Sequence, residues 1–551
     1  MQKLHQQTYL GTVAFVCSLA ACIQPSWADP QPVPTANIQP SSELLFSQGQ
    51  TPRPSPGTIT IREITFKGDP SITVFSDERL REILNLQTGQ TVSERELQEA
   101  VNRITQSYIN GGYLTSQAEL TNRQEGNITI TIRERGISNV RIEGNTRLQE
   151  YVRSRIAVGL ATPLNTNALE EQLRLLRNDP LIANIEASLR GEDGGTILSI
   201  RVTDAEPLFA AVGVDNYSPP SVGSERFVIS AGNRNLLGLG DELSVVYNRT
   251  ILGGAEGIEL GYRVPLNGLN GTVQLRTSWS RNRVIQEPFA EFDIRGQSEL
   301  YELTIRQPIA RSFQQEFAIS LGLSYQDGQT FTFAGPTPFG IGPAPDGTTR
   351  TTTLRLGQDF LSRDNQGIWS IRSTFNLGLG IFDATINPRP IPDGRFFSWL
   401  GQIQRLQVLG TDHLLLMQGD VQLSANSLLP PQQLVIGGGQ SVRGFRQNAR
   451  AGDNGARLSV EHRWILARNE NSVPSLTISP FLEGGWVWNN PRNPNTLGDQ
   501  SFLAGAGLGL LWQPVSNLSI RLDYGVPLVR LNDRGDNAQD RGFYFNINYQ
   551  F

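Results

Sequence analysis

From Leu208 to Phe551 the chain alternates between apolar and polar residues, and its final segment shows the pattern most clearly. One set of alternate positions there is apolar: Phe543, Phe545, Ile547, Tyr549 and Phe551. The intervening positions are Tyr544, Asn546, Asn548 and Gln550. Successive side chains of a β-strand point to opposite faces. The pattern therefore predicts strands with one apolar face and one largely polar face.

Segments of this kind recur through residues 207–551 and predict a transmembrane β-barrel of about sixteen antiparallel strands. The strands are expected at 207–217, 226–234, 240–250, 256–265, 270–282, 297–308, 313–327, 349–360, 367–380, 396–409, 412–424, 455–466, 475–488, 500–514, 517–526 and 540–551. An even strand number, with apolar residues outside and charges inside, is typical of outer-membrane barrels. A soluble β-sandwich also alternates and is the competing interpretation.

The connections between these strands alternate in length. Longer segments such as 328–348 and 425–454 follow odd-numbered strands, and short ones such as 410–411 follow even-numbered strands. Outer-membrane barrels have short periplasmic turns and longer external loops. Both ends of the barrel chain are therefore expected in the periplasm, and 425–454 becomes the sixth external loop, which we expect to fold inward.

Ahead of the barrel, residues 58–135 and 136–206 show the same order of elements, which is strand, helix, helix, strand, strand. In the first copy Ser93 and Glu96 form a capping box, after which an apolar stripe of Leu97, Val101, Ile104 and Tyr108 follows helical spacing. Repetition of one element order predicts two α+β domains of the same type.

The N-terminal residues are expected to serve export. Residues 1–28 have a short basic start, an apolar stretch and a small-residue cleavage site before Asp29, as in a secretory signal peptide. A lipoprotein site at Cys22 is the alternative. Residues 29–57 are rich in proline and predict a linker. Within them, residues 42–48 are long enough only for a short helix.

Composition narrows the candidate chemistry. Removal of residues 1–28 takes away both cysteines, Cys17 and Cys22, and the net charge of −5 is spread without a basic tract, which disfavours nucleic-acid binding. The expected mature chain has two histidines, His413 and His462, interpreted as wall residues. We find no phosphate-binding loop, metal-ligand spacing or acid–base cluster, so no cofactor, metal or enzymatic activity is predicted.

One glycine-rich segment stands out inside the sixth external loop. It contains Val442, Arg443, Gly444 and Phe445 after a run of three glycines that starts at Gly437. Glycines allow backbone conformations that other residues avoid. A cationic side chain shielded from water needs an acidic partner. The segment therefore predicts an arginine that enters the barrel, although a plain surface turn fits the same residues.

A candidate partner lies on the thirteenth strand. Phe481, Glu483 and Gly485 share one face, and Trp486 and Trp488 occupy the other. If the tryptophans face lipid, Glu483 faces the lumen. The same alternation predicts further lumen-lining charges: Arg457, Glu461, Arg463, Arg521 and Asp523. For each of these, stabilisation of a filled barrel is the alternative to lining a hydrated conduit.

With the Arg443 loop, the Phe481-x-Glu483-x-Gly485 strand and two repeated α+β modules, residues 58–551 resemble two-partner secretion transporters (TpsB) of the haemolysin-activator type. The resemblance implies two periplasmic POTRA domains, and an inward loop whose arginine pairs with a wall acid, usually Asp and here Glu483. It also implies Phe551 as a C-terminal insertion signal read by the barrel-assembly machinery. Members often carry an N-terminal plug helix, for which only residues 42–48 are available here.

The implied function is secretion of an unfolded exoprotein, TpsA-like and β-helical once outside, through a barrel in outer-membrane lipid. A barrel-insertase role is the alternative within the same superfamily. Two modules argue against it, since insertases usually carry more. A passive porin would leave the repeated modules unexplained. Exchange of the charges at 443 and 483 is expected to retain some function if the pair itself matters.

Overall fold

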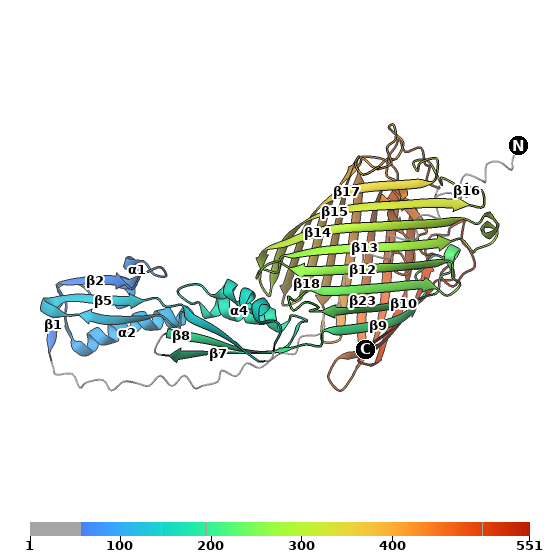
Figure 1. Cartoon of the computed structure of the whole chain (residues 1–551). Coiled ribbons are helices and arrows are strands. Elements are labelled where there is room, and N and C mark those ends of the chain that lie inside the picture. Colours follow the sequence, from blue (N-terminus) through green and yellow to red (C-terminus); the bar gives the residue numbers. More distant parts are fainter. Residues whose placement is uncertain (1–56, 145, 193–194, 499) are drawn as a thin grey trace. The chain divides into compact units, whose positions relative to one another are not determined.

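The computed structural model describes residues 57–144, 146–192, 195–498 and 500–551. The expected signal peptide, residues 29–56 of the expected linker and the expected short helix at 42–48 lie outside these residues. The described chain forms two compact units, one up to Ala205 and one from Glu206 to Phe551 (Figure 1).

The first module is a three-stranded sheet covered by two helices. Its elements are β1 (Thr58–Thr60), β2 (Glu63–Gly68), α1 (Asp77–Leu84), β3 (Thr91–Ser93), α2 (Glu94–Asn110), β4 (Gln117–Asn122), the turn η4 (Gln124–Gly126) and β5 (Asn127–Arg133). The sheet order is β2-β5-β4, with β2 parallel to β5. The sequence predicts one strand over 59–66, but the structure has two, because β1 leaves the sheet to pair with β3.

The capping box and the helical stripe of this module are confirmed. The Ser93 hydroxyl accepts a hydrogen bond from the Glu96 backbone, and the Glu96 carboxylate accepts one from the Ser93 backbone. The stripe of α2 is fully buried against β-strand residues such as Ile128, Ile130 and Ile132. The apolar positions that predicted the helix are therefore the positions that it buries in the core of the module.

A buried carboxylate closes one end of this module. Glu134, directly after β5, accepts hydrogen bonds from the backbone N–H groups of Thr73 and Val74, from the Thr73 hydroxyl and from the hydroxyl of Tyr108. Burial by itself raises the pKa of Glu134, but the hydrogen bonds from Thr73, Val74 and Tyr108 outweigh it and lower that pKa overall. The carboxylate thus ties the β2–α1 connection to α2.

The second module repeats the predicted element order. It contains β6 (Ile137–Glu143), α3 (Gln149–Ile156), η5 (Ala157–Gly159), α4 (Thr166–Arg177), β7 (Ile182–Glu192) and β8 (Gly195–Asp204), with sheet order β6-β8-β7. Leu148, Val152 and Leu169 pack against Leu198 and Ile200 to form its own core. Repetition in the sequence therefore corresponds to repetition of a folded unit.

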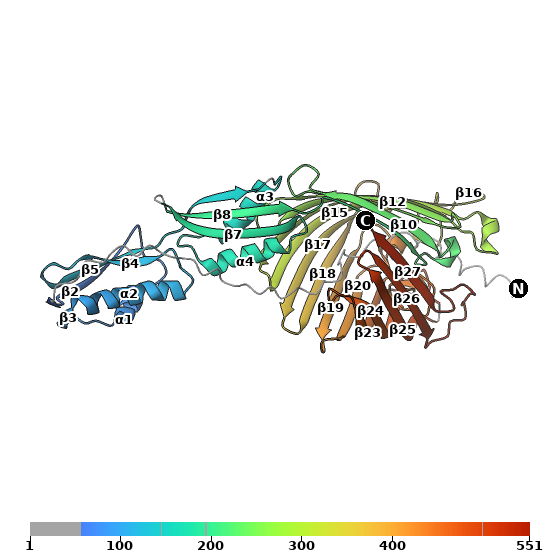
Figure 2. The same cartoon turned by 90° about the horizontal axis from the view of Figure 1, so that it is seen from below.

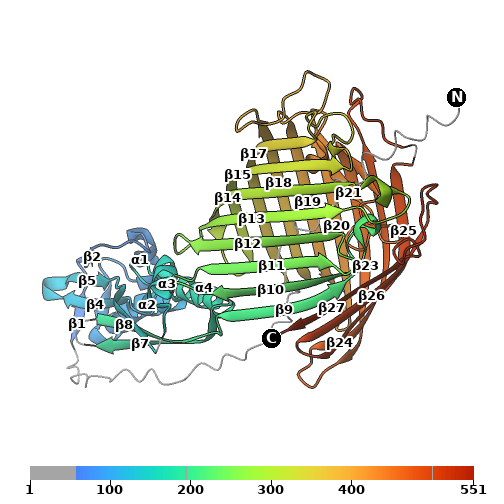
Figure 3. The ribbon, with the colours of Figure 1, turned by 45° about the vertical axis from the view of Figure 1, so that its right-hand side comes forward.

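The second unit is a closed antiparallel barrel, as predicted (Figures 1 and 2). Its sixteen main strands are β9 (Leu208–Asp215), β10 (Arg226–Arg234), β11 (Glu242–Thr250), β12 (Ala255–Pro265), β13 (Thr272–Arg283), β14 (Arg295–Arg311), β15 (Gln315–Thr332), β17 (Thr348–Asp364), β18 (Gly367–Leu379), β19 (Phe397–Val408), β20 (His413–Ser424), β23 (Asn454–Arg468), β24 (Pro474–Trp488), β25 (Phe502–Val515), β26 (Leu518–Pro527) and β27 (Phe543–Gln550). The short β16 (Gly335–Pro336) pairs only with β15. Pairing of β27 with β9 closes the ring (Figure 3).

The two faces of the wall follow the predicted alternation. On the outward face Leu482, Trp486 and Leu522 are about half exposed, as suits contact with lipid. On the inward face Glu483 and Asp523 are buried. No helix within the described part of the chain is long and apolar enough to cross a membrane.

The connections also follow the predicted scheme. Turns after even-numbered strands are short, for example 365–366 and 516–517, whereas the longest connection, 425–453, follows β20, the eleventh strand. The external connection 251–254 is an exception, because it is as short as the periplasmic turns. The arginine loop is therefore the sixth connection at the external end.

Candidate functional site

The sixth external connection (425–453) folds back onto the inner wall of the barrel. Its two sides are the short strands β21 (Leu434–Ile436) and β22 (Arg450–Gly452), which pair with each other after the turn η8 (Pro430–Gln432). Between them, residues 437–449 form the loop tip. Val442 and Phe445 of the tip are buried beside Val487 and Leu503 of the wall.

Glycines of the loop and of the wall allow this close approach. Gly437, Gly438 and Gly444 all have φ near +100°, a region that side chains disfavour. On the wall, a Cβ at Gly505 would overlap the carbonyl oxygen of Arg443, and one at Gly525 would lie 2.6 Å from the Gly444 nitrogen. The wall glycines thus form part of the seat for the tip.

Arg443 contacts three carboxylates of the inner wall. Its Nε and Nη2 donate to Glu483 Oε1 at 3.0 and 2.6 Å, and its backbone N–H donates to Glu483 Oε2 at 2.7 Å. Nη1 donates to Asp523 Oδ1 at 2.9 Å, and Nη2 also donates to Glu461 Oε2 at 3.0 Å. All four side chains are at most 5% exposed. We call Glu461, Glu483 and Asp523 the carboxylate seat.

Two further arginines balance the charge of the carboxylate seat. Arg463 donates to Glu461 at 2.9 Å, and Arg521 donates to both Glu461 and Asp523 at 2.9 and 2.8 Å. Three cations therefore face three anions. A buried charge is costly unless it is paired and hydrogen-bonded, and this balance meets that requirement.

Phe481 and Gly485 have distinct contacts with the tip. The Arg443 guanidinium carbon lies 3.4 Å from the centroid of the Phe481 ring, a cation–π contact. A Cβ at Gly485 would press on Ile436 and Val442 at 3.1 and 3.3 Å. The Phe-x-Glu-x-Gly pattern of β24 thus supplies a ring, a carboxylate and a space for one loop tip.

Tyr544 on β27 also holds the tip, and the sequence did not single it out. Its hydroxyl accepts a hydrogen bond from the Gly444 N–H at 2.8 Å and donates one to the Phe445 carbonyl at 2.6 Å. The only sequence signal for Tyr544 was its position on the inward face of the last strand. The closing strand is therefore bonded to the backbone next to Arg443.

The remaining predicted residues lie in two places. Arg457 also meets the loop, because its Nη1 donates to the Gln440 carbonyl at 3.1 Å and lies 3.5 Å from Asp420. Phe551 is on the outward face, with its ring centroid 5.0 Å from that of Tyr549. The structure thus brings together every predicted site residue except Phe551.

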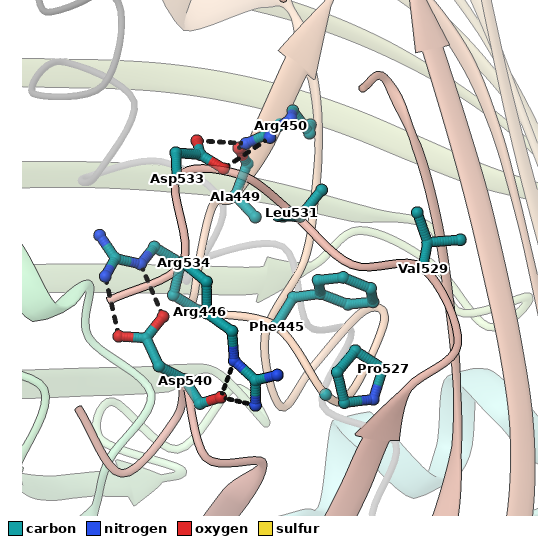
Figure 4. A pocket seen from close by; sticks show the side chains of 11 residues that line it. Phe445, Arg446, Ala449, Arg450, Pro527, Val529, Leu531, Asp533, Arg534 and Asp540 are labelled. Carbon is teal, nitrogen blue, oxygen red and sulfur yellow. Dashed lines mark hydrogen bonds and ion pairs between the residues drawn. The ribbon is translucent and has the colours of Figure 1, made fainter. Parts of the chain in front are cut away.

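A second set of contacts joins the sixth external connection to the external connection 528–542. Arg446 pairs with Asp540 at 2.8 Å, and Arg450 pairs with Asp533 at 2.9 Å (Figure 4). Phe445 lies beside them in a small pocket. Burial raises the pKa of Asp533, but the hydrogen bond from Arg450 and the positive charge of that arginine together outweigh burial and lower the pKa overall. Sequence reasoning missed these pairs, since both partners lie in loops without periodicity.

A third contact anchors the C-terminal end of the loop. Asp453 is fully buried and accepts hydrogen bonds from the backbone N–H groups of Leu428 and Asn490 and from the side chains of Gln433 and Asn493. It thereby joins the two ends of the loop to the connection after β24. No periodic signal marks Asp453 in the sequence.

The arrangement holds the loop against the inner wall of the barrel. Within the described ranges, no group of three or more His, Cys, Asp or Glu residues is placed to hold a metal ion. The three carboxylates that lie together, Glu461, Glu483 and Asp523, are already occupied by arginine side chains. The site can therefore fix the loop inside the barrel, or release it if these ion pairs separate.

Comparisons with known proteins identify the family of the chain. Residues 194–511 match the family described as haemolysin secretion/activation protein ShlB/FhaC/HecB, and residues 59–134 match the POTRA domain of ShlB type. The outer membrane transporter CdiB of Escherichia coli is 25% identical over 507 residues, covering 87% of this chain and 81% of CdiB. The hemolysin transporter protein ShlB of Serratia marcescens is 24% identical, covering 74% of this chain and 72% of ShlB.

Among solved structures, CdiB from Escherichia coli is similar with a TM-score of 0.70 and 21% identity, over 93% of each chain. At this identity the likeness concerns the fold alone. It supports the architecture of α+β modules followed by a sixteen-stranded barrel.

Proposed function

Since this chain belongs to the family of haemolysin secretion/activation proteins, it is an outer-membrane translocator of two-partner secretion, and we propose that its Arg443 loop governs passage through the barrel. Its N-terminal modules lie in the periplasm, and transporters of this family act on a secreted exoprotein. The observation that carries the proposal is the occupation of three inward carboxylates by one loop arginine.

In the proposed mechanism the exoprotein crosses the barrel as an unfolded chain. Barrels of sixteen strands are wide enough for an aqueous channel, whereas a folded domain is wider. The loop tip occupies part of that space in the structure described here. Passage of a client chain therefore requires the tip to shift away from the carboxylate seat.

The opposite wall of the barrel suits an extended client. Its inward charges are paired between strands at 2.6 to 2.8 Å: Arg276 with Glu259, Arg306 with Glu316, Arg355 with Glu302 and Arg372 with Asp359. Paired charges present a hydrated surface with little apolar area for a client to adhere to. Transport of this kind needs no catalytic group in the chain.

The periplasmic modules supply strand edges for client capture. In the first module β4 lies at one edge of its sheet, and in the second module β7 does. An extended peptide can add to such an edge through backbone hydrogen bonds, which depend little on the peptide's sequence. We therefore assign the first contact with the unfolded exoprotein to these edges.

Biogenesis of the transporter itself requires further partners. Residues 1–28 are proposed to direct export across the inner membrane, and the barrel-assembly machinery to insert the barrel into outer-membrane lipid. Phe551 is the proposed contact for that machinery, because its side chain is 75% exposed on the outward face.

The experiment that tests this function compares proteins in the culture supernatant and in the outer membrane before and after deletion of the gene. Selective loss of one or a few large secreted proteins, restored by the gene on a plasmid, would support the translocator. General depletion of other outer-membrane barrels would instead support an insertase and contradict the proposal.

A further inference from the structure

A leucine-rich turn connects β10 and β11. Residues 235–240 read Asn-Leu-Leu-Gly-Leu-Gly, and we call them the leucine turn. The side chains of Leu236, Leu237 and Leu239 are 40%, 63% and 55% exposed. At the same end of the barrel, the turns Asn365-Gln366 and Ser516-Asn517 are polar. The turns 266–271 and 409–412 each expose one leucine, Leu266 and Leu409, whereas the leucine turn exposes three. Three neighbouring exposed leucines indicate a surface that is covered in the working protein.

The leucine turn lies at the periplasmic end of the barrel. The chain enters the barrel from the periplasmic modules at Leu208, the first residue of β9. Because β9 and β10 are antiparallel, Leu208 pairs with Asn233 near the end of β10. The turn that follows β10 is therefore at the periplasmic end of the barrel and not at the external end.

Hydrogen bonds direct this turn toward the outer face of the barrel. Tyr262 shares the outward face of β12 with the exposed Ile258, and its hydroxyl donates to Asp241 Oδ2 at 2.9 Å. Asp241 is fully buried, and its Oδ1 accepts from the backbone N–H of Leu237 at 2.9 Å and of Leu239 at 3.4 Å. The turn thus folds over a carboxylate on the lipid side of the wall.

The backbone of the turn is held in one shape. Asn235 Oδ1 accepts from the Gly240 N–H at 2.9 Å, and Gly238 and Gly240 have φ of 85° and 75°, where glycine is favoured. The leucines are therefore presented by a fixed loop. An apolar turn with a fixed backbone loses little conformational freedom when it is buried in lipid or protein.

We propose that the leucine turn is a membrane anchor that inserts Leu237 and Leu239 among the phospholipid acyl chains of the periplasmic leaflet. The apolar surface is continuous with the lipid face of the barrel, where Leu208 and Ile229 are exposed. Tyr262 lies at the junction, and amphipathic aromatic rings favour the membrane–water interface. The anchor is an addition to the secretion function and does not depend on it.

Depth-dependent fluorescence quenching tests this proposal on the full chain. Cys17 and Cys22 are replaced by serine, one cysteine is introduced as Leu237→Cys and labelled with a polarity-sensitive fluorophore, and the protein is reconstituted in phosphatidylethanolamine/phosphatidylglycerol vesicles. Lipids with a nitroxide on the acyl chain serve as quenchers. Asn517→Cys, in a polar turn at the same barrel end, is the matched control.

The expected result is a blue-shifted label at position 237 whose quenching by the acyl-chain nitroxide is several-fold greater than at position 517. Equal, weak quenching at both positions would overturn the proposal. A blue-shifted label at 237 without lipid quenching would also overturn it, because protein would then cover the turn. Adding Asp241→Asn should reduce quenching at 237, and unchanged quenching would refute the orienting role of Asp241.

Discussion

Arg443 donates three hydrogen bonds to the carboxylate of Glu483, two from its guanidinium and one from its own backbone N–H. One acid therefore fixes both the side chain and the main chain of the loop tip. Asp523 and Glu461 occupy the remaining directions of the guanidinium. The loop is consequently bound to strands β23, β24 and β26 at once, and the predictions below follow from that geometry.

Exchange of charges between loop and wall should not restore transport. In an Arg443→Glu, Glu483→Arg double variant the new glutamate would lie next to Glu461 and Asp523, and like charges at this separation repel. The sequence alone predicted some function after exchange of the charges at 443 and 483, and the two additional carboxylates change that prediction. Secretion by the double variant should be no better than by either single variant, measured as exoprotein in the supernatant. Clear recovery would show that Glu461 and Asp523 contribute little.

Loss of one hydroxyl on the closing strand should loosen the loop tip. Tyr544→Phe leaves the Gly444 N–H and the Phe445 carbonyl without their shared partner, which typically costs about 1–3 kcal/mol. Faster hydrogen exchange in residues 437–449 is the expected readout. Tyr549→Phe, on the lipid face of the same strand, is the control and should leave exchange there unchanged. Equal exchange in both variants would contradict the role given to Tyr544.

A single methyl group should displace the loop from the wall. Gly505→Ala would place a Cβ against the Arg443 carbonyl, whereas Gly484→Ala meets only the Leu503 carbonyl at an ordinary 3.7 Å. We expect the Gly505 variant to expose the tip to added protease while the Gly484 variant resembles the unaltered protein. Overpacking of this kind commonly costs about 1–3 kcal/mol. Protection of the tip in both variants would be inconsistent with the close seat.

Acid should destabilise the first periplasmic module through Glu134. Its pKa in the folded module is lowered from the ordinary value of about 4.3. The carboxylate therefore contributes stability above that ordinary value, and this contribution is lost as the pH falls through the lowered folded pKa. The protection of residues 58–133 against hydrogen exchange, relative to the intrinsic rate at each pH, should fall over this acid range in the unaltered protein. In Glu134→Gln this protection should be lower already at neutral pH and should respond less to acid; an unchanged acid response would contradict the role given to Glu134.

The sequence sufficed for the barrel because period-2 alternation is a local property. Each strand carries its own signal, and the inward direction of Glu483 followed from Trp486 and Trp488 on the other face. The capping box at Ser93 was readable for the same reason. By contrast, the division of the first predicted strand into β1 and β2 depends on pairing with β3, which alternation does not encode.

The composition of the carboxylate seat could not be read from one strand. Glu461 lies opposite Phe481 across the β23–β24 register, and Asp523 comes from β26, which does not pair with β24. Their convergence on Arg443 depends on barrel curvature and on the path of the loop. Tyr544 and Asp453 were missed because their partners lie in loops, whose backbone and amide groups show no periodic pattern in the sequence.

Secretion by an Arg443→Ala variant shows whether transport depends on the arginine loop. The exoprotein in the culture supernatant is quantified by mass spectrometry alongside the amount of heat-modifiable barrel in the outer membrane, in a deletion strain carrying either the unaltered gene or the variant. The account predicts a normal amount of inserted barrel with strongly reduced exoprotein outside. Normal secretion by a normally inserted variant would show that transport does not depend on the arginine loop.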